Sequence, residues 1–420
     1  MNSRERIKKA LNHQETDKIP VDFGGTFATG MNVNIVYKLR QKLELDKPGT
    51  PVKVIEPFQM LGEIGDDLRK IIGIDCIPLH GKENFFGFEN NKWKEWKLFD
   101  GTPVLVPDLF NIIPEKDGSI FQYPQGDKSA SPCAKMPKTG YCFELIMRQE
   151  KINDGCLDVS DNLEEFTLIS DENLEYLKEK ARNLYDNTKY SLFGNICFSA
   201  FGDVAIVPGP TLKHPKGIRD ISEWYVSLIT RKEYIRKIFE GQLEIALENY
   251  KRLYRAIGNK IEAIWISGQD FGFQSGLFIS VDLYKDLFKQ YLIKVNKWIH
   301  ENTSWKTMIH TCGSVETLIR EFIETGFNII NPVQISAFNM NPNHLKNKYG
   351  KNITFWGGGV DTQKTLPFGT PEDVKKEVKM NIKIFIKGGG FVFSAVHNIM
   401  PNVPIENVIS MIETVSNYKI

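Results

Sequence analysis

The chain has 420 residues, of which 41% are hydrophobic and 25% are charged, a composition typical of a globular enzyme and unlike that of a disordered chain. Its 53 Lys and Arg residues nearly balance 52 Asp and Glu residues, and no basic arm indicates a nucleic-acid partner. The sequence offers neither a membrane span nor the apolar core of a signal peptide, and its six cysteines are dispersed as in reduced proteins, so we expect a cytoplasmic location.

The beginning of the chain predicts short elements with helical or strand patterning. Residues 3–14 are charged and amphipathic, as expected of a helix, and residues 20–23 form a short apolar strand. Helices are predicted at 34–45 and at 59–71, the second because its apolar residues recur at helical spacing. Residues 72–78 then read as the end of a strand.

Residues 80–160 have a different character from the rest of the chain. Aromatic and aliphatic residues alternate with polar ones between Trp93 and Tyr123. Asp100-Gly101 and Asp117-Gly118 are typical of hairpin turns. This pattern predicts a β-rich insertion near residues 80–160 that lies on the main domain.

From residue 160 onward, apolar strands alternate with helical patterns. The predicted strands are 191–200, 261–267, 306–312, 328–333, 353–357 and 390–396. The predicted helices lie near 221–256, 280–302, 314–325, 371–387 and 404–418. Such alternation indicates a parallel sheet covered by helices, and with the two early strands it favours an α/β fold of the (β/α)8 TIM-barrel type, as a single domain over residues 1–420. A doubly wound sheet is less favoured, because no glycine-rich dinucleotide motif follows a strand.

Two of the predicted strands end in residues that are typical zinc ligands. His310 and Cys312 are two residues apart on one strand, so both side chains point to the same face. His397 lies at the end of the last strand. Two imidazoles and a thiolate suit Zn²⁺ and leave its fourth position open, as in catalytic sites. The alternative is that the His-x-Cys pair serves packing only.

Other strand-end residues are candidates for substrate contact. We predict Asp270 as the catalytic residue, acting as a general base, a substrate anchor or a partner that fixes an imidazole tautomer; the alternative is a cap for the following turn. Gln269, Glu56 and Asn398 are predicted to bind substrate. The remaining histidines are interpreted as surface residues: His13, His80, His214, His300 and His344.

Several runs of the sequence resemble the uroporphyrinogen decarboxylase superfamily, which includes zinc-dependent corrinoid methyltransferases. They are spread over nearly the whole chain: residues 4–11 (RERIKKAL), 17–21 (DKIPV), 270–272 (DFG), 279–284 (ISVDLY), 310–315 (HTCGSV), 357–361 (GGGVD), 368–374 (FGTPEDV) and 396–408 (VHNIMPNVPIENV). The resemblance implies a (β/α)8 barrel but does not fix the reaction.

Two branches of that superfamily differ at identifiable positions. The decarboxylases carry an arginine-containing Gln-Ala-Gly-Arg-Tyr stretch after the first strand, where residues 23–32 read FGGTFATGMN and the first arginine is Arg40. The methyltransferase branch has His-x-Cys at one strand end, which His310 and Cys312 match, and a Cys near the last strand, where this sequence has His397. The resemblance therefore favours the methyltransferase branch, with one ligand changed.

The change of ligand alters the charge of the expected metal site. Two thiolates and one imidazole neutralise Zn²⁺, whereas one thiolate and two imidazoles leave a net charge of about +1, which makes a stronger Lewis acid for an oxygen or nitrogen substituent. We therefore expect a zinc-dependent methyltransferase that moves a methyl group between a methoxylated aromatic or methylated amine and a corrinoid.

The corrinoid (methylcobalamin) is expected on a partner protein, because the sequence has no Asp-x-His-x-x-Gly signature. Two alternatives remain: a uroporphyrinogen-type decarboxylase without a metal, and a non-catalytic barrel that binds a corrinoid or a partner. A homodimer is left open.

Overall fold

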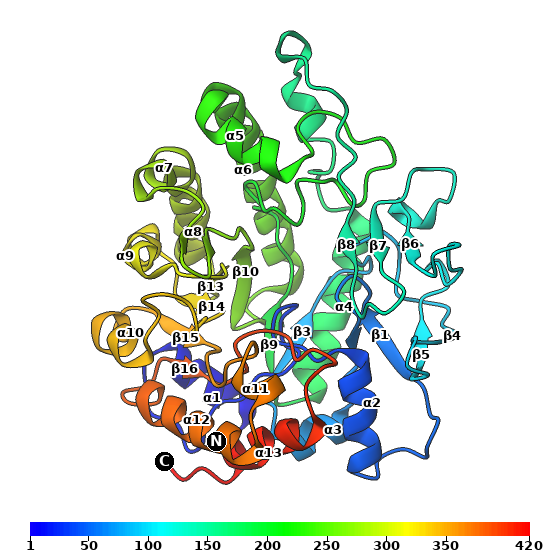
Figure 1. The fold of residues 1–420 in the computed structure, drawn as a ribbon. Helices are drawn as coiled ribbons and strands as arrows, with labels where there is room; N and C mark the ends of the chain where they lie inside the picture. The colour runs from blue at the N-terminus through cyan, green and yellow to red at the C-terminus, as the bar shows by residue number, and fades with distance from the viewer.

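A ring of parallel strands lies at the centre of the computed structural model, which describes all residues 1–420 (Figure 1). Seven strands follow one another around it in chain order, each paired with the next. They are β3 (Cys76–Leu79), β9 (Ser191–Gly194), β10 (Ala263–Ser267), β13 (Lys306–His310), β14 (Ile329–Asn331), β15 (Thr354–Trp356) and β16 (Phe391–Val392). Nearly all of their residues are buried, because helices cover the outside and side chains fill the inside.

The predicted short strand at residues 20–23 closes the ring between β16 and β3. Val21 forms a parallel bridge with Phe393. The amide of Asp22 donates to the carbonyl of Phe393 at 2.8 Å, and the amide of Asp75 donates to the carbonyl of Val21 at 2.8 Å. Eight segments therefore complete the barrel, and the predicted (β/α)8 fold is confirmed.

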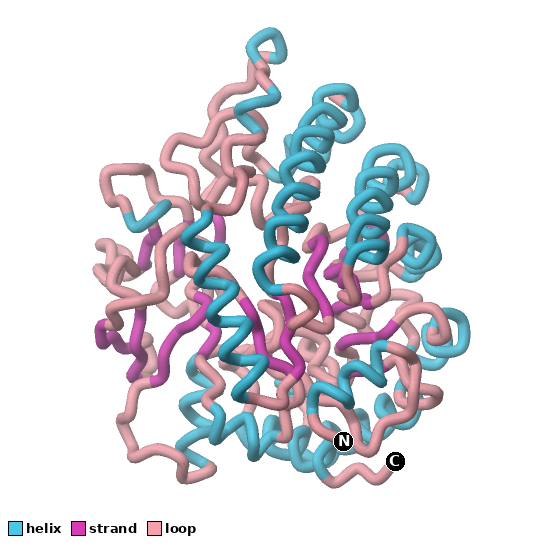
Figure 2. The backbone as a smooth tube through the Cα atoms, turned by 180° about the vertical axis from the view of Figure 1, so that it is seen from behind, coloured by secondary structure: helices cyan, strands magenta, loops and turns pink.

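Helices surround the barrel on its outer face (Figure 2). They are α2 (Val33–Lys42), α3 (Asp66–Ile72), α4 (Asp171–Asn187), α5 (Ile221–Thr230), α6 (Lys232–Ile257), α7 (Val281–Tyr284), which a π-helical turn joins to α8 (Gln290–Asn302), α9 (Glu316–Thr325), α10 (Pro342–Tyr349), α11 (Thr365–Phe368), α12 (Pro371–Phe385) and α13 (Ile405–Ser416). None of them is both long enough and apolar enough to cross a bilayer.

Local sequence explains where several helices begin. Helix α12 starts with a capping box, in which Thr370 and Asp373 bond each other's backbone amides, and Pro371 occupies the first turn. Helix α1 (Ser3–Leu11) has the same box between Asn2 and Glu5. Capped ends of this kind satisfy amides that the helix itself leaves free.

Helix α1 closes the end of the barrel that lies opposite the carboxyl ends of its strands. Its buried residues Ile7, Ala10 and Leu11 pack in one cluster with side chains from seven barrel strands. That cluster includes Trp265 and Trp356. The barrel interior is therefore a packed core, and open space is left at the carboxyl ends of its strands.

The predicted β-rich insertion is present beside the barrel, but it recruits an earlier segment. Two small sheets form there, one of β1 (Val52–Glu56), β2 (Leu61–Gly62), β4 (Lys94–Lys97) and β5 (Pro103–Val106), the other of β6 (Ile120–Gln122), β7 (Ala134–Met136) and β8 (Glu144–Leu145). Strands β4 and β5 form a hairpin around Asp100-Gly101, as predicted. Strand β1 pairs in parallel with β5, a non-local contact that the sequence pattern did not predict.

Several predicted elements have wrong boundaries. The strands predicted at 306–312 and 390–396 end at His310 and Val392. The helix predicted at 59–71 is β2 followed by α3, because Asn32 and residues of β1 pair with the start of this segment. The strand predicted at 191–200 ends at Gly194, after which the chain leaves the sheet. The helix predicted at 221–256 is interrupted at Arg231, whose backbone is not helical.

Candidate metal centre

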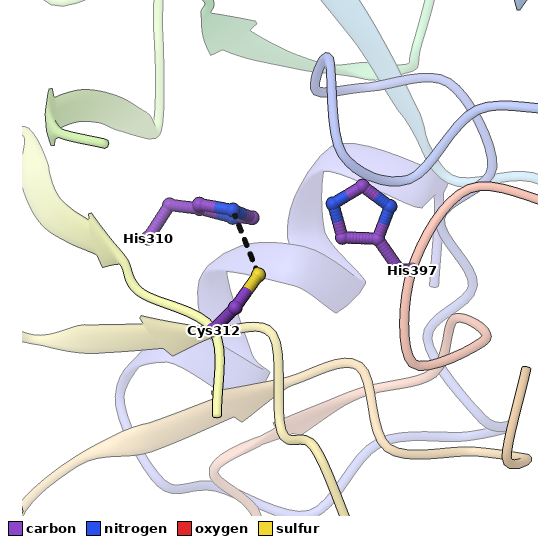
Figure 3. A group of neighbouring side chains, drawn as sticks. All are labelled: His310, Cys312 and His397. Carbon is purple, nitrogen blue, oxygen red and sulfur yellow. Dashed lines mark hydrogen bonds between the residues drawn. The ribbon is translucent and has the colours of Figure 1, made fainter. Parts of the chain in front are cut away.

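The three predicted zinc ligands lie together at the carboxyl ends of the barrel strands (Figure 3). His310 is the last residue of β13, and Cys312 lies two residues further along, just past the end of the strand. His397 lies in the loop after β16, on the far side of β14 and β15 in the strand order. One ligand atom of each residue lies within 4.8 Å of those of the other two. The curvature of the closed sheet therefore joins residues that are far apart in sequence.

Hydrogen bonds orient the imidazole of His310. Its Nδ1 lies 2.7 Å from Oδ1 of Asn331, and Nδ2 of Asn331 donates to the carbonyl of Trp356 at 2.8 Å. Because the Asn331 oxygen accepts, Nδ1 of His310 carries the proton and Nε2 keeps its lone pair. Nε2 faces Sγ of Cys312 at 3.6 Å, and the ring stacks on Trp265 with centroids 4.9 Å apart. The ring is thus fixed in the tautomer that a metal at Nε2 requires.

The donor set fits zinc in distance and in chemistry. Zn–N and Zn–S bonds in tetrahedral geometry place the two donor atoms about 3.6 Å apart, and the Nε2 to Sγ distance is 3.6 Å. Burial lowers the pKa of His310 and of His397 to about 4, so both imidazoles are neutral near pH 7, the form that binds metals. Burial and the nearby Asp270 carboxylate raise the pKa of the Cys312 thiol, so a bound cation would have to displace its proton.

Asp270 lies beside this cluster and holds the turn that carries Cys312. Its Oδ1 accepts the backbone amide of Cys312 at 2.7 Å. Burial raises the pKa of its carboxyl group above the ordinary range, while the bond from Cys312 opposes that shift. Its backbone carbonyl accepts the hydroxyl of Tyr225 at 3.1 Å. Asp270 therefore contacts both the ligand turn and the open space in front of it.

A cavity of about 520 Å³ opens in front of the cluster. His310, His397 and Asp270 lie on its wall, together with Trp265. Its size falls in the range of sites for small organic molecules. A substrate in this cavity would reach the open side of the histidine and cysteine cluster.

The structure separates the three predicted substrate-binding residues. Glu56, the last residue of β1, lines the cavity, and its carboxylate accepts the amides of Phe58 and Gln59 at 3.0 and 2.7 Å. Gln269 is buried and does not line the cavity. Asn398 does not line it either.

The side chain of Asn398 is occupied by structural hydrogen bonds. Its Oδ1 accepts the amide of Gly30 at 2.6 Å, and its Nδ2 donates to the carbonyl of Phe27 and to Gln59. These contacts fasten the loop after the first barrel segment. The structure therefore does not support the prediction that Asn398 binds substrate.

Several cavity residues were missed by the sequence reasoning. His80 directly follows β3 and lines the cavity, so its interpretation as a surface residue was wrong. The rule that polar residues at strand ends gather at the barrel mouth would have found it. Asn195 and Asp203 lie in the loop after β9, and of the two only Asn195 falls within the segment predicted as strand, 191–200. No periodic signal marks their place.

The bond between Asn331 and His310 leads to a testable prediction. Replacing Asn331 with Ala should weaken zinc binding by about 10- to 100-fold, because the imidazole loses the acceptor that fixes its tautomer. Asn331→Asp is the matched control, since it keeps an oxygen acceptor in the same place. Competition for zinc with a coloured chelator measures both variants, and equal affinities of wild type and Asn331→Ala would contradict the assigned role.

Comparisons with known proteins place this geometry in context. Residues 216–418 match the sequence model of the uroporphyrinogen decarboxylase (URO-D) family. The structure is similar to that of a methyltransferase from Methanosarcina mazei, with a TM-score of 0.52 and 14% sequence identity, over 99% of this chain and 98% of that one. At this identity the similarity is one of fold. No curated protein sequence matches the chain.

Proposed function

We propose that this chain is a zinc-dependent methyltransferase, because residues 216–418 match the uroporphyrinogen decarboxylase family model and because two imidazoles and a thiol lie together at the mouth of its barrel. It would move a methyl group between a small methylated substrate, a methoxylated aromatic or a methylated amine, and a corrinoid carried by a partner protein. The name of the Methanosarcina mazei protein, whose fold it shares, supports this class of reaction.

The observation that carries the proposal is the donor set of His310, Cys312 and His397. Three protein donors would leave the fourth zinc position facing the cavity, as in catalytic sites. A zinc ion bound there would supply Lewis acidity, with a net charge of about +1, to the oxygen or nitrogen that loses the methyl group.

The surrounding residues of the chain orient this centre and its substrate. Asn331 and Trp265 hold the His310 ring from its edge and from one face. Asp270 fixes the backbone of Cys312 and presents its carboxyl group to the same cavity. We assign Asp270 to positioning the ligand turn and the substrate, which combines two of the roles predicted for it.

Porphyrinogen decarboxylation is not proposed. A porphyrinogen carries many carboxylates, and its binding needs cationic side chains. None of the residues that line the cavity is Lys or Arg. The composition of the cavity thus agrees with the lack of an arginine between residues 23 and 32.

The proposal can be tested on the Cys312→Ser variant. The purified zinc-loaded protein is mixed with a Co(I) corrinoid and a panel of methoxylated aromatics and methylated amines, and the absorbance change to methylcobalt is followed. We expect Cys312→Ser to slow this change by at least about 100-fold, because a hydroxyl is a poor substitute for a thiolate ligand. Cys156→Ser, at an exposed cysteine, is the matched control. Full activity of Cys312→Ser would contradict the proposal of a zinc-dependent methyltransferase.

A further inference from the structure

The cavity wall is rich in acidic side chains and has no lysine or arginine to balance them. Five acidic residues line the cavity: Glu56, Glu83, Glu165, Asp203 and Asp270. Of its histidines, His310 and His397 are the proposed zinc ligands, and burial lowers the pKa of His80 to about 4, so that His80 adds no positive charge near pH 7. The protein side chains alone therefore give the cavity no group that would attract an anion.

Three of these five acidic residues have a countercharge beside them or are exposed to solvent. Glu165 forms a buried ion pair with Arg219 at 2.6 Å. Asp270 lies beside Cys312, where the +1 charge of the proposed zinc centre would balance it. Glu83 is exposed to solvent. Two acidic residues, Glu56 and Asp203, then remain on the cavity wall without a cationic partner.

Neither Glu56 nor Asp203 takes part in an ion pair within the chain. Glu56 is 6% exposed, and its carboxylate accepts only the two backbone amides of Phe58 and Gln59. That of Asp203 accepts only the amide of Ala205, at 2.9 Å. Burial raises the pKa of each to about 7, as expected for carboxyl groups that lack a countercharge. A cation in the cavity would provide the missing partner.

The walls of the cavity suit a cation that carries methyl groups. Six aromatic side chains line it: Phe27, Phe58, Phe85, Phe166, Phe198 and Trp265. Aromatic faces attract organic cations through their quadrupoles and bury methyl groups at the same time.

Asp203 is placed next to one of these rings. A β-carbon at Gly268 would collide with Oδ2 of Asp203 and would lie 3.3 Å from Nε1 of Trp265. Gly268 therefore allows the carboxylate and the indole to lie close together on the wall. Asn195 also lines the cavity, and its buried Oδ1 has no hydrogen-bond partner, so it offers a further acceptor.

We propose that the cavity binds a small organic cation with a methylated ammonium group, held by the carboxylate of Asp203 and the aromatic walls, with Glu56 as the second unpaired acid. This inference rests on the proposed function and deepens it, because it selects methylated amines over methoxylated aromatic acids as substrates. A substrate with a carboxylate would face these acidic groups, and no lysine or arginine lines the cavity to bind it.

The test compares ligands of the same shape and different charge. Choline and 3,3-dimethylbutan-1-ol differ in a trimethylammonium versus a tert-butyl group, and 4-methoxybenzoate supplies an anionic methoxylated compound. Isothermal titration calorimetry of the zinc-loaded protein, without corrinoid, should show choline binding at least about tenfold more tightly than its neutral isostere, and 4-methoxybenzoate binding more weakly than both.

Two substitutions test whether Asp203 is the residue that binds the cation. Asp203→Asn should reduce choline affinity by about tenfold or more and leave that of 3,3-dimethylbutan-1-ol unchanged, whereas Asp108→Asn, at an exposed acid outside the cavity, should change neither. Circular dichroism and zinc content show whether each variant is folded and loaded. Absent choline binding, equal affinity for the isostere, or tighter binding of 4-methoxybenzoate would each overturn the inference.

The experiments on cation binding and on methyl transfer can fail independently of each other. Preference for choline without any methyl transfer would leave the cation site standing and sink the methyltransferase. Methyl transfer only from neutral or anionic methoxylated compounds would support the methyltransferase and contradict the cation site.

Discussion

Purified His310→Ala protein is expected to bind zinc at least about 100-fold more weakly than the wild type and to lose methyl transfer. His310 offers Nε2 toward Cys312 Sγ at 3.6 Å, and its ring is held by Asn331 and Trp265. Alanine at this position leaves only two protein ligands, and two ligands bind zinc much more weakly than three do. Elemental analysis after gel filtration should fall from about one zinc per chain to near none.

The control for this experiment is His214→Ala. His214 is exposed on a loop and does not line the cavity, so its replacement should not change the zinc content. Since adventitious zinc often binds surface histidines, this pair separates a defined site from incidental binding. One zinc per chain in His310→Ala would show that the ion is held elsewhere.

Replacing Arg6 with Met is expected to lower the free energy of unfolding by about 3–5 kcal/mol. Arg6 lies on α1 with only 4% of its surface exposed, and its guanidinium bonds Asp17 at 2.7 Å and also Asp75. Asp75 is fully buried, and its second oxygen accepts the amide of Val21, in the segment that closes the barrel. Without Arg6, the Asp75 carboxylate would be a buried charge with no cationic partner at hydrogen-bond distance.

Two further variants test this explanation. Arg236→Met removes a more exposed arginine that pairs with Glu233 and Asp286, and should cost at most about 1 kcal/mol. The double variant Arg6→Met with Asp75→Asn should be more stable than Arg6→Met alone, because the uncompensated charge is gone while an acceptor for Val21 remains. Urea denaturation curves measure all of them. Additive losses in the double variant would contradict the charge explanation.

The pattern of residues along the chain was enough to predict the fold class and the three candidate metal ligands. Apolar strands alternating with amphipathic helices specify a covered parallel sheet, because both periodicities follow from local backbone geometry. The same geometry predicted His310 and Cys312 on one face of a strand; in the structure the strand ends at His310, yet the Cys312 side chain still lies beside the His310 ring. The position of Asp270 at the end of its strand likewise predicted a place near them, since parallel strands end at one mouth.

Contacts between segments that are distant in the sequence could not be predicted and are seen only in the folded chain. His397 lies beside His310 because the sheet closes into a ring, and β1 joins the insertion by pairing with β5. Glu56, His80 and Asp203 line one cavity although they come from three separate loops or strand ends. The side chain of Asn398 instead forms hydrogen bonds that hold the loop around Gly30. Loops have no periodicity, and strand pairing is chosen by packing between segments far apart in the chain. The ligand types could therefore be named from the sequence, whereas the acidic and aromatic wall in front of them could not.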